Sequence, residues 1–238
     1  MREGPTKDTR GTAETDSLGL LADRALEFVP QHAVIGLGSG RAATAFLIAL
    51  SSRIQQGLSV RGVPTSEATA RRCRQLGIPL VGLEGALLDV TIDGADEVDP
   101  QLNLIKGYGG ALVRERIVAA ASRRQIILVD ADKLVPVLGS RGRLPVEVVP
   151  FGLPLSRRRL EALGCRPKLR EEEGRPFVTD NGNWIADCYV DPITDPRALD
   201  SAIRAIPGVV DTGLFLGTAD TVLVAQGGIV KELKRRQS

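Results

Sequence analysis

The chain has 238 residues, of which 43% are hydrophobic and 25% are charged, and its formal net charge at pH 7 is +2. These proportions are those of a globular protein with a sizeable core, and the balanced charge disfavours a nucleic-acid-binding protein. No apolar run approaches the ~18 residues that a membrane-spanning helix needs, so we expect none.

The sequence of the first half of the chain predicts a polar N-terminal segment followed by alternating strands and helices. Residues 1–17 are polar and lack the apolar centre of a signal peptide, so we expect a mobile tail before a first helix at residues 18–29. From AVIGLG to QIILVDADK, short β-branched runs, IPLVGL among them, alternate with helix-like segments. This alternation is typical of an α/β fold, here a Rossmann-like domain with a parallel sheet and helices on both faces.

The pattern changes near Ser140 and returns near Leu214. Residues 140–213 read as strand, helix, strands, helix and strand, and TDNGNW contains the Asn-Gly pair of a hairpin turn. We therefore predict a small α+β insert of the ferredoxin-like type, with residues 1–139 and 214–238 forming the main, catalytic α/β domain. The hairpin is a candidate for subunit packing, and the basic end, KELKRRQS, is expected to be a solvated helix.

Histidine and cysteine are scarce, and this limits the chemistry. His32 is the only histidine and is expected to lie at a turn, so a His-based metal site or a Ser-His-Asp triad is disfavoured. Cys73, Cys165 and Cys188 form no CxxC pair, which predicts neither a zinc site nor a disulfide framework. A reducing cytoplasm is the simplest location. Acid–base chemistry is left to carboxylates, lysines or a cysteine.

The loop at residues 36–40, GLGSG, follows the first predicted strand and opens a helix. Such a loop presents backbone N–H groups to an anion. It is not a full dinucleotide fingerprint, because Arg41 stands at the third glycine position and no acidic residue lies between Glu27 and Glu67. The phosphate of a smaller ligand fits better, with Ser39 and Arg41 as contacts. A tight strand-to-helix turn without a ligand is an equal alternative.

Two further loops also follow predicted strands, where parallel sheets bind ligands. In PTSEAT, Thr65 or Ser66 is expected to cap a helix. DGADE contains Asp93, Asp96 and Glu97. These carboxylates are suited to Mg²⁺ or Ca²⁺, or to the vicinal hydroxyls of a sugar, or they form a solvated acidic turn. The spacing of a calcium loop is absent and a lysine follows, which disfavours the metal.

That lysine, Lys106, opens the glycine-rich segment KGYGGAL, which leads into a helix. Glycines let a ligand approach the backbone, and a lysine there can neutralise an oxyanion or a phosphate. Glu115 follows, and partial burial would raise its pKa towards that of a general base, whereas Arg114 and Arg116 would lower it. A surface ion pair is the alternative for Glu115. Lys133, in DADK, either closes a site over an anionic substrate or lies in solvent.

The order of these motifs resembles the ribose-5-phosphate isomerase type A family. The motifs are GLGSG, TSEAT, DGADE, KGYGGAL–RE, DADK, PVEVVP, TDNGN and IPGVVDTGLF, and the resemblance covers about Leu18 to Lys231. It implies interconversion of ribose 5-phosphate and ribulose 5-phosphate through an enediolate, without a metal or an organic cofactor. It also implies a homodimer or homotetramer, with no nucleic-acid or membrane partner.

The resemblance also implies a role for each matching residue. Glu115 matches the catalytic base, Asp93 and Asp96 match carboxylates that hold substrate hydroxyls and assist ring opening, and Lys106 matches the charge-stabilising lysine of the glycine loop. The implied substrate- and phosphate-binding residues come from three loops and one lysine: Ser39, Gly40, Arg41, Ala42, Gly94, Ala95, Gly107, Tyr108, Gly109 and Lys133.

The sequence departs from the family pattern at the phosphate loop. GSGRA stands where GTGST is usual, so Ala42 replaces a hydroxyl and Arg41 replaces a serine. We expect Arg41 to contact the phosphate in their place. Tyr108 also stands where a glycine is usual. The altered loop leaves an isomerase of another sugar phosphate as an alternative. A non-catalytic sugar-phosphate sensor is a further alternative, disfavoured by the intact acid–base residues.

Overall fold

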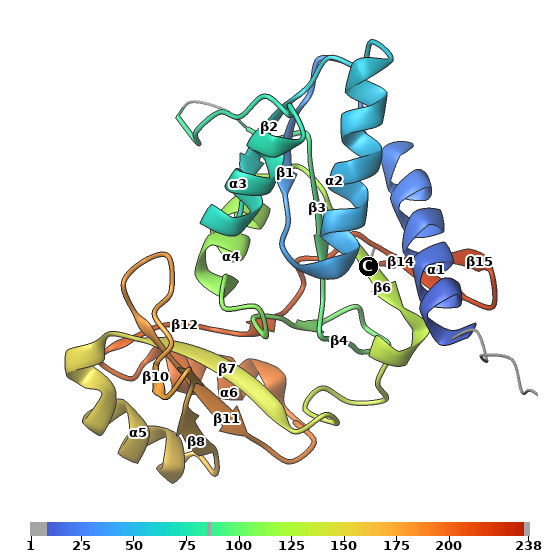
Figure 1. The fold of residues 1–238 in the computed structure, drawn as a ribbon. Helices are drawn as coiled ribbons and strands as arrows, with labels where there is room; N and C mark the ends of the chain where they lie inside the picture. The colour runs from blue at the N-terminus through green and yellow to red at the C-terminus, as the bar shows by residue number, and fades with distance from the viewer. Residues whose placement is uncertain (1–8, 85–86, 236–238) are drawn as a thin grey trace, which may run out of the picture.

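The computed structural model describes residues 9–84 and 87–235 and is built on two main sheets (Figure 1). A six-stranded sheet occupies the upper half of the figure and a four-stranded sheet the lower half, with a short three-stranded sheet as a further element. Within the described ranges, no helix is long and apolar enough to cross a membrane.

The six-stranded sheet has the order β15-β14-β6-β3-β1-β2, and all neighbours are parallel except β14 and β15. The strands are β1 (Val34–Leu37), β2 (Arg61–Pro64), β3 (Val90–Gly94), β6 (Gln125–Asp130), β14 (Thr221–Gln226) and β15 (Ile229–Lys234). From β1 the chain builds first to one side, with β2, and then to the other, with β3. This reversal makes the carboxyl ends of β1 and β3 the expected ligand crevice.

Helices cover both faces of this sheet, as the alternating pattern predicted. They are α1 (Thr9–Leu26), α2 (Gly40–Gln55), α3 (Glu67–Gln75) and α4 (Leu112–Ala120). Along β6, Ile126 and Leu128 pack into the core that α1 and α2 share. Ile127 and Val129 point to the opposite face and pack with Leu112 of α4. The side-chain alternation of one strand therefore serves two cores.

The four-stranded sheet confirms the predicted ferredoxin-like type. Its order is β12-β7-β11-β8, fully antiparallel, and its elements follow the sequence βαββαβ. They are β7 (Arg143–Val148), α5 (Leu153–Ala162), β8 (Arg166–Leu169), β11 (Trp184–Tyr189), α6 (Pro196–Arg204) and β12 (Val209–Thr212), with a small hairpin of β9 (Glu171–Glu172) and β10 (Arg175–Pro176). We call residues 143–212 the small unit, and we propose that residues 140–213 form a domain of their own.

The third sheet and two 3₁₀ turns complete the described elements. The sheet pairs β4 (Glu97–Val98), β5 (Leu104–Ile105) and β13 (Leu214–Phe215), and the turns are η1 (Ala131–Lys133) and η2 (Pro150–Gly152). Glu97, the last acid of DGADE, is fully buried and accepts hydrogen bonds from the backbone N–H groups of Gly139 (2.7 Å) and Arg141 (2.8 Å). Its carboxylate therefore fixes the position of the segment that leads into the small unit.

Three local predictions differ from the structure. The first helix begins at Thr9, so only residues 1–8 of the expected tail lie outside the described residues. IPLVGL forms a single bridge, between Leu80 and Gly62, rather than a strand, and Pro79 has no N–H to give to a ladder.

The basic end is also not a helix within the described residues. Gly227 and Gly228 have φ of +60° and +77°, which makes a tight hairpin turn, and β15 pairs antiparallel with β14. Lysines such as Lys231 and Lys234 then lie on an edge strand, where charge discourages pairing with another chain.

Candidate active site

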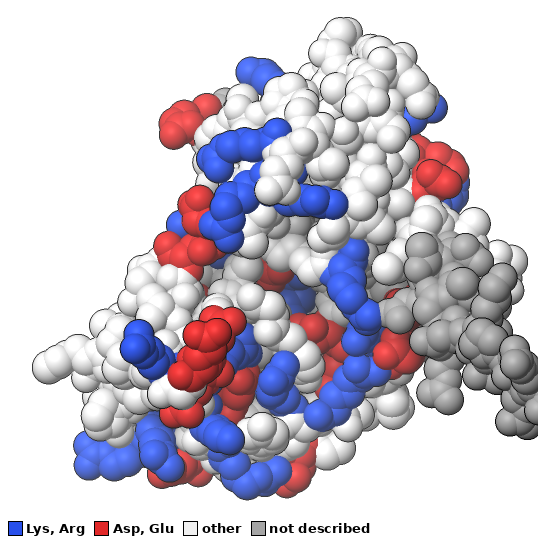
Figure 2. All heavy atoms as spheres, viewed as in Figure 1, with Lys and Arg blue, Asp and Glu red and all other residues white. Residues whose placement is uncertain are grey.

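A cavity of about 150 Å³ lies at the carboxyl ends of β1, β3 and β6. Figure 2 shows this part of the molecule as a hollow between its upper and lower halves, with acidic atoms inside and basic side chains along its edges. The lining residues come from α1, from the start of α2, from the segments after β1, β3 and β5, and from α4, β6 and η1: Leu18, Ser39, Gly40, Arg41, Ala42, Gly94, Ala95, Asp96, Lys106, Gly107, Gly109, Glu115, Leu128, Val129, Asp130 and Lys133.

A buried lysine between two carboxylates forms the inner wall of the cavity. Lys106 is 2% exposed, and its Nζ lies 3.0 Å from Asp93 Oδ2 and 3.4 Å from Glu115 Oε1. Glu115 is 5% exposed, and its Oε2 has no hydrogen-bond partner among the described residues. One oxygen of Glu115 is thus held near the ammonium, and the other is buried in the cavity wall without a polar partner among the described residues.

Asp93 is held beside Lys106 by hydrogen bonds from the backbone of two segments. Its Oδ1 accepts hydrogen bonds from the backbone N–H groups of Ser39 (3.0 Å) and Gly94 (2.8 Å), and its Oδ2 faces Lys106. A Cβ at Gly38 would lie 2.2 Å from Asp93 Oδ1, so only glycine lets the two loops approach this closely. Asp93 is fully buried and is not among the lining residues, so its contact with a substrate hydroxyl stays a prediction.

The electrostatics of the cluster follow from burial. Burial raises the pKa of Glu115 to about 8, against the opposing effect of the Lys106 ammonium, while Asp93 raises it further. Burial alone would lower the pKa of Lys106, but Asp93 and Glu115 beside it raise the pKa on balance. Arg114 and Arg116, which were expected to lower the Glu115 pKa, are not among the main groups that shift it, and both guanidinium groups pair with other segments.

Asp96 and Tyr108 are linked through the backbone of the glycine loop. Asp96 lines the cavity, and its Oδ2 accepts a hydrogen bond from the Tyr108 N–H (2.9 Å). Burial raises the Asp96 pKa, and the bond from Tyr108 opposes this. The Tyr108 ring packs 3.8 Å from the Arg143 guanidinium, and its hydroxyl donates to the Arg143 carbonyl. The Tyr108 side chain therefore joins the glycine loop to β7 and is not among the lining residues.

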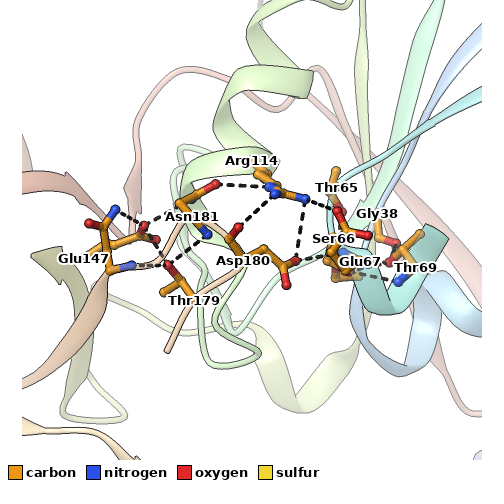
Figure 3. Close-up of polar contacts among 12 residues, drawn as sticks. Gly38, Thr65, Ser66, Glu67, Thr69, Arg114, Glu147, Thr179, Asp180 and Asn181 are labelled. Atoms are coloured by element: carbon orange, nitrogen blue, oxygen red, sulfur yellow. Dashed lines mark hydrogen bonds and ion pairs between the residues drawn. The ribbon is translucent and has the colours of Figure 1, made fainter. Parts of the chain in front are cut away.

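Hydroxyl groups gather beside the first loop. Ser39 Oγ lies 2.8 Å from Thr65 Oγ1, and Thr69 Oγ1 donates to the Gly38 carbonyl (3.0 Å). Ser66 caps α3, as predicted, by accepting a hydrogen bond from the Thr69 N–H (Figure 3). These bonds fix the loop after β1 to the start of α3.

The sequence therefore identified most of the cavity. All predicted site residues except Asp93 and the Tyr108 side chain line it, including Arg41, Ala42 and Lys133. Asp130, in the DADK loop, follows a predicted strand but was given no role, and Leu128 and Val129 of β6 were missed, although the rule that ligands bind at strand ends could have found them. Leu18 was also missed, and nothing in its local sequence marks it.

The described side chains include no group of three or more His, Cys, Asp or Glu residues arranged to hold a metal ion. The acidic residues of DGADE diverge instead, because Asp93 faces Lys106 and Glu97 faces backbone amides near Gly139. Among the described residues, the side chains of DGADE are therefore not arranged as the metal site that the sequence left open.

Comparison with known proteins gives consistent similarities. Residues 61–228 match the family described as ribose 5-phosphate isomerase A (phosphoriboisomerase A). The chain is 52% identical over 217 residues to ribose-5-phosphate isomerase A of Roseiflexus castenholzii, an alignment that covers 90% of this chain and 93% of the relative.

Solved structures of the same kind superpose on the whole fold. The ribose 5-phosphate isomerase of Plasmodium falciparum has a TM-score of 0.89 and 38% identity, covering 93% of this chain and 100% of the other. A D-ribose-5-phosphate isomerase in complex with phospho-erythronic acid has a TM-score of 0.89 and 37% identity, covering 94% of this chain and 99% of the other.

The ion cluster predicts the effect of removing its positive charge. In Lys106→Met the pKa of Glu115 should rise above its value of about 8, because the ammonium is the group that lowers it. The free energy of unfolding should fall by ~3 kcal/mol, since one partner of a buried pair is lost. Carboxyl ¹³C NMR titration and urea unfolding measure the two effects. Lys168→Met, at an exposed lysine of β8, is the control, and an unchanged Glu115 pKa in Lys106→Met would contradict the account.

Proposed function

The chain belongs to the ribose 5-phosphate isomerase A family, and we propose that Glu115 is the base with which it interconverts D-ribose 5-phosphate and D-ribulose 5-phosphate. The observation that carries this proposal is the buried carboxylate of Glu115, with one oxygen 3.4 Å from Lys106 and the other unbonded among the described residues. A pKa raised to about 8 places this base near the operating pH, where general base catalysis is efficient.

The proposed reaction moves one proton between adjacent carbons of the open-chain sugar. Glu115 removes the proton from C2, and the electrons of that bond form a C1–C2 double bond while the C1 carbonyl becomes an enediolate oxygen. Glu115 then returns the proton to C1, and the hydroxyl proton of O2 passes to O1, so that the C2 carbonyl forms. One carboxylate on one side of the sugar suffices for both carbon transfers. C1 is reduced as C2 is oxidised within the same molecule, so no external oxidant or reductant is needed.

Lys106 is proposed to stabilise the enediolate. Its ammonium lies in the cavity wall beside Glu115, and its Nζ also donates to the Gly94 carbonyl. A fixed positive charge in a water-poor site stabilises developing negative charge without reorganisation. Asp96, the carboxylate that lines the same cavity, is proposed to hold substrate hydroxyls and to assist ring opening. Asp93, which is fully buried and faces Lys106, is proposed for the same role.

The phosphate is proposed to bind at the other end of the cavity. Arg41 and Lys133 both line it, and the start of α2 presents backbone N–H groups at Gly40 to Ala42. Ser39, the residue before α2, makes no side-chain cap to the helix, which leaves these N–H groups without that partner. Arg41 lines the cavity at the same helix start, which supports it as the residue that replaces the hydroxyl missing at Ala42.

Assembly and location are also proposals. We propose a homodimer or homotetramer, supported by apolar side chains exposed on the small unit, above all Phe151, which is 97% exposed. We propose a cytoplasmic location, supported by three cysteines that are buried and unpaired: Cys73, Cys165 and Cys188.

Replacing the proposed base tests the mechanism. Glu115→Gln should lower kcat by ~10²–10⁴-fold, because an amide of the same shape cannot accept the proton. Binding of phospho-erythronic acid, measured by calorimetry, should persist. Glu161→Gln, at an exposed glutamate of α5, is the control. Turnover near that of the wild type in Glu115→Gln would rule out this base.

Removing Arg41 tests the phosphate contact. Arg41→Ala should raise KM for ribose 5-phosphate by ~10–100-fold, since a hydrogen bond to a charged group contributes ~1.5–3 kcal/mol. kcat should change much less, because a phosphate contact is made equally in the ground state and in the transition state. Arg53→Ala, at an exposed position in the last turn of the same helix, is the control. An unchanged KM in Arg41→Ala would contradict the assignment.

A further inference from the structure

Helix α4, which carries Glu115, has a start that its own sequence does not fix. The residue before it, Ala111, has no side chain that could cap the helix, and the first turn is closed only by backbone bonds such as Glu115 N–H to the Ala111 carbonyl (3.0 Å). A side-chain cap usually contributes ~1 kcal/mol to such a turn. Other contacts must therefore hold the base in place.

Arg114, directly before Glu115, makes contacts to two other segments (Figure 3). Its Nε donates to Asn181 Oδ1 (3.1 Å), its Nη2 to the Asp180 carbonyl (2.9 Å) and its Nη1 to Glu67 Oε1 (3.0 Å). All three nitrogens of one rigid guanidinium are thus used, which fixes its orientation better than a single ion pair would. These bonds join α4 to α3 and to the Asn-Gly turn of the small unit.

That turn is in turn anchored in the small unit by a fully buried carboxylate. Glu147 Oε1, on β7, accepts hydrogen bonds from Thr179 Oγ1 (3.0 Å), Asn181 Nδ2 (3.1 Å) and Asn183 Nδ2 (2.9 Å). Asn181 therefore uses both ends of its amide, donating to Glu147 and accepting from Arg114. Only one orientation of the amide satisfies both partners.

The same turn holds the start of α3. Asp180 Oδ2 accepts a hydrogen bond from the Glu67 N–H (2.7 Å), next to Ser66, whose hydroxyl caps the helix. A continuous chain of polar contacts therefore runs from Glu147 through the turn to α3 and α4, in the way that Figure 3 shows.

Arg116, on the other side of Glu115, is held similarly by a different part of the chain. Its Nη2 donates to the carbonyls of Thr212 (2.7 Å) and Leu214 (2.9 Å), and its guanidinium lies 4.0 Å from the centre of the Phe215 ring. The two arginines bind segments near residues 180 and 212, while the residue between them faces the cavity.

We propose that Arg114 and the turn at residues 179–183 form a brace that sets the position of Glu115, which makes Arg114 a positioning residue for the base. The inference rests on the proposed catalytic role of Glu115. The contacts of Arg114 itself lie near the surface, because the side chains of Arg114, Glu67 and Asp180 are 31%, 52% and 31% exposed. Such contacts contribute little to folding, whereas a base displaced by about 1 Å can cost ~10²-fold in rate.

The test uses Arg114→Ala, Asn181→Ala and the double variant in the full-length protein. kcat should fall by ~10–100-fold in each single variant, with KM changed less than ~2-fold. The double variant should lose little more than either single one, because both break the same chain of contacts. Arg166→Ala is the matched control, since this exposed arginine of β8 pairs with Asp191 (3.2 Å) of the small unit.

The pH profile separates positioning from a general loss of structure. A loosened α4 should admit water to Glu115 and lower its pKa from about 8, so the acid limb of kcat/KM should move to lower pH in both single variants. If kcat and the acid limb stay at wild-type values, or if the losses add in the double variant, the brace is wrong. These results would leave the proposed role of Glu115 as the base untouched. That role is tested separately, by the turnover of Glu115→Gln. If Arg114→Ala does not fold, Asn181→Ala decides alone.

Discussion

The ammonium of Lys106 lies in the protein interior between Asp93 and Glu115, at 3.0 Å and 3.4 Å. Charges are costly to bury, and this cluster has one cation for two carboxylates. Asp93 has two backbone N–H groups as further partners, whereas Glu115 Oε2 has none among the described residues. Glu115 is therefore the carboxyl group that ionises least readily, and its pKa is raised to about 8.

The fold brings these three residues together from distant segments. Asp93 lies in β3, one residue before its end, Lys106 follows β5 and Glu115 lies on α4. They meet where the strand order reverses between β1 and β3. Gly38, directly after β1, lets this loop approach Asp93 of β3 closely. The small unit acts from outside, through Arg170, which donates to the carbonyls of Gly107 and Tyr108, and through the contacts of Arg114.

Much of this could be predicted from the sequence, because strand and helix periodicity and loop chemistry are local. The parallel sheet, the ferredoxin-like unit and the cap at Ser66 belong to this group. The direction in which a side chain points depends on the tertiary fold, so it could not be predicted from the local sequence. Glu97 looked like one more acid of a ligand site, yet it binds the backbone at Gly139. Arg114 and Arg116 looked like neighbours that would lower the Glu115 pKa, but helical geometry turns them towards other segments.

The terminal strand β15 shows a second limit. Its residues are basic and polar enough to read as a solvated helix, but the Gly227–Gly228 turn and the open edge of β14 make pairing more favourable. Tertiary context of this kind overrides intrinsic propensity. The exclusion of the Tyr108 ring from the cavity has the same origin, because its partner Arg143 belongs to a strand that only folding brings near.

The pH dependence of kcat/KM for ribose 5-phosphate tests the central claim most directly, because it reports ionisations of the free enzyme and substrate. The account predicts that kcat/KM rises with pH through an acid limb near pH 8, which reflects Glu115 and lies well above the ~6 expected for the substrate phosphate. A profile that is already level above pH 6.5 would show that the buried lysine leaves Glu115 ionised at neutral pH, and it would contradict the account.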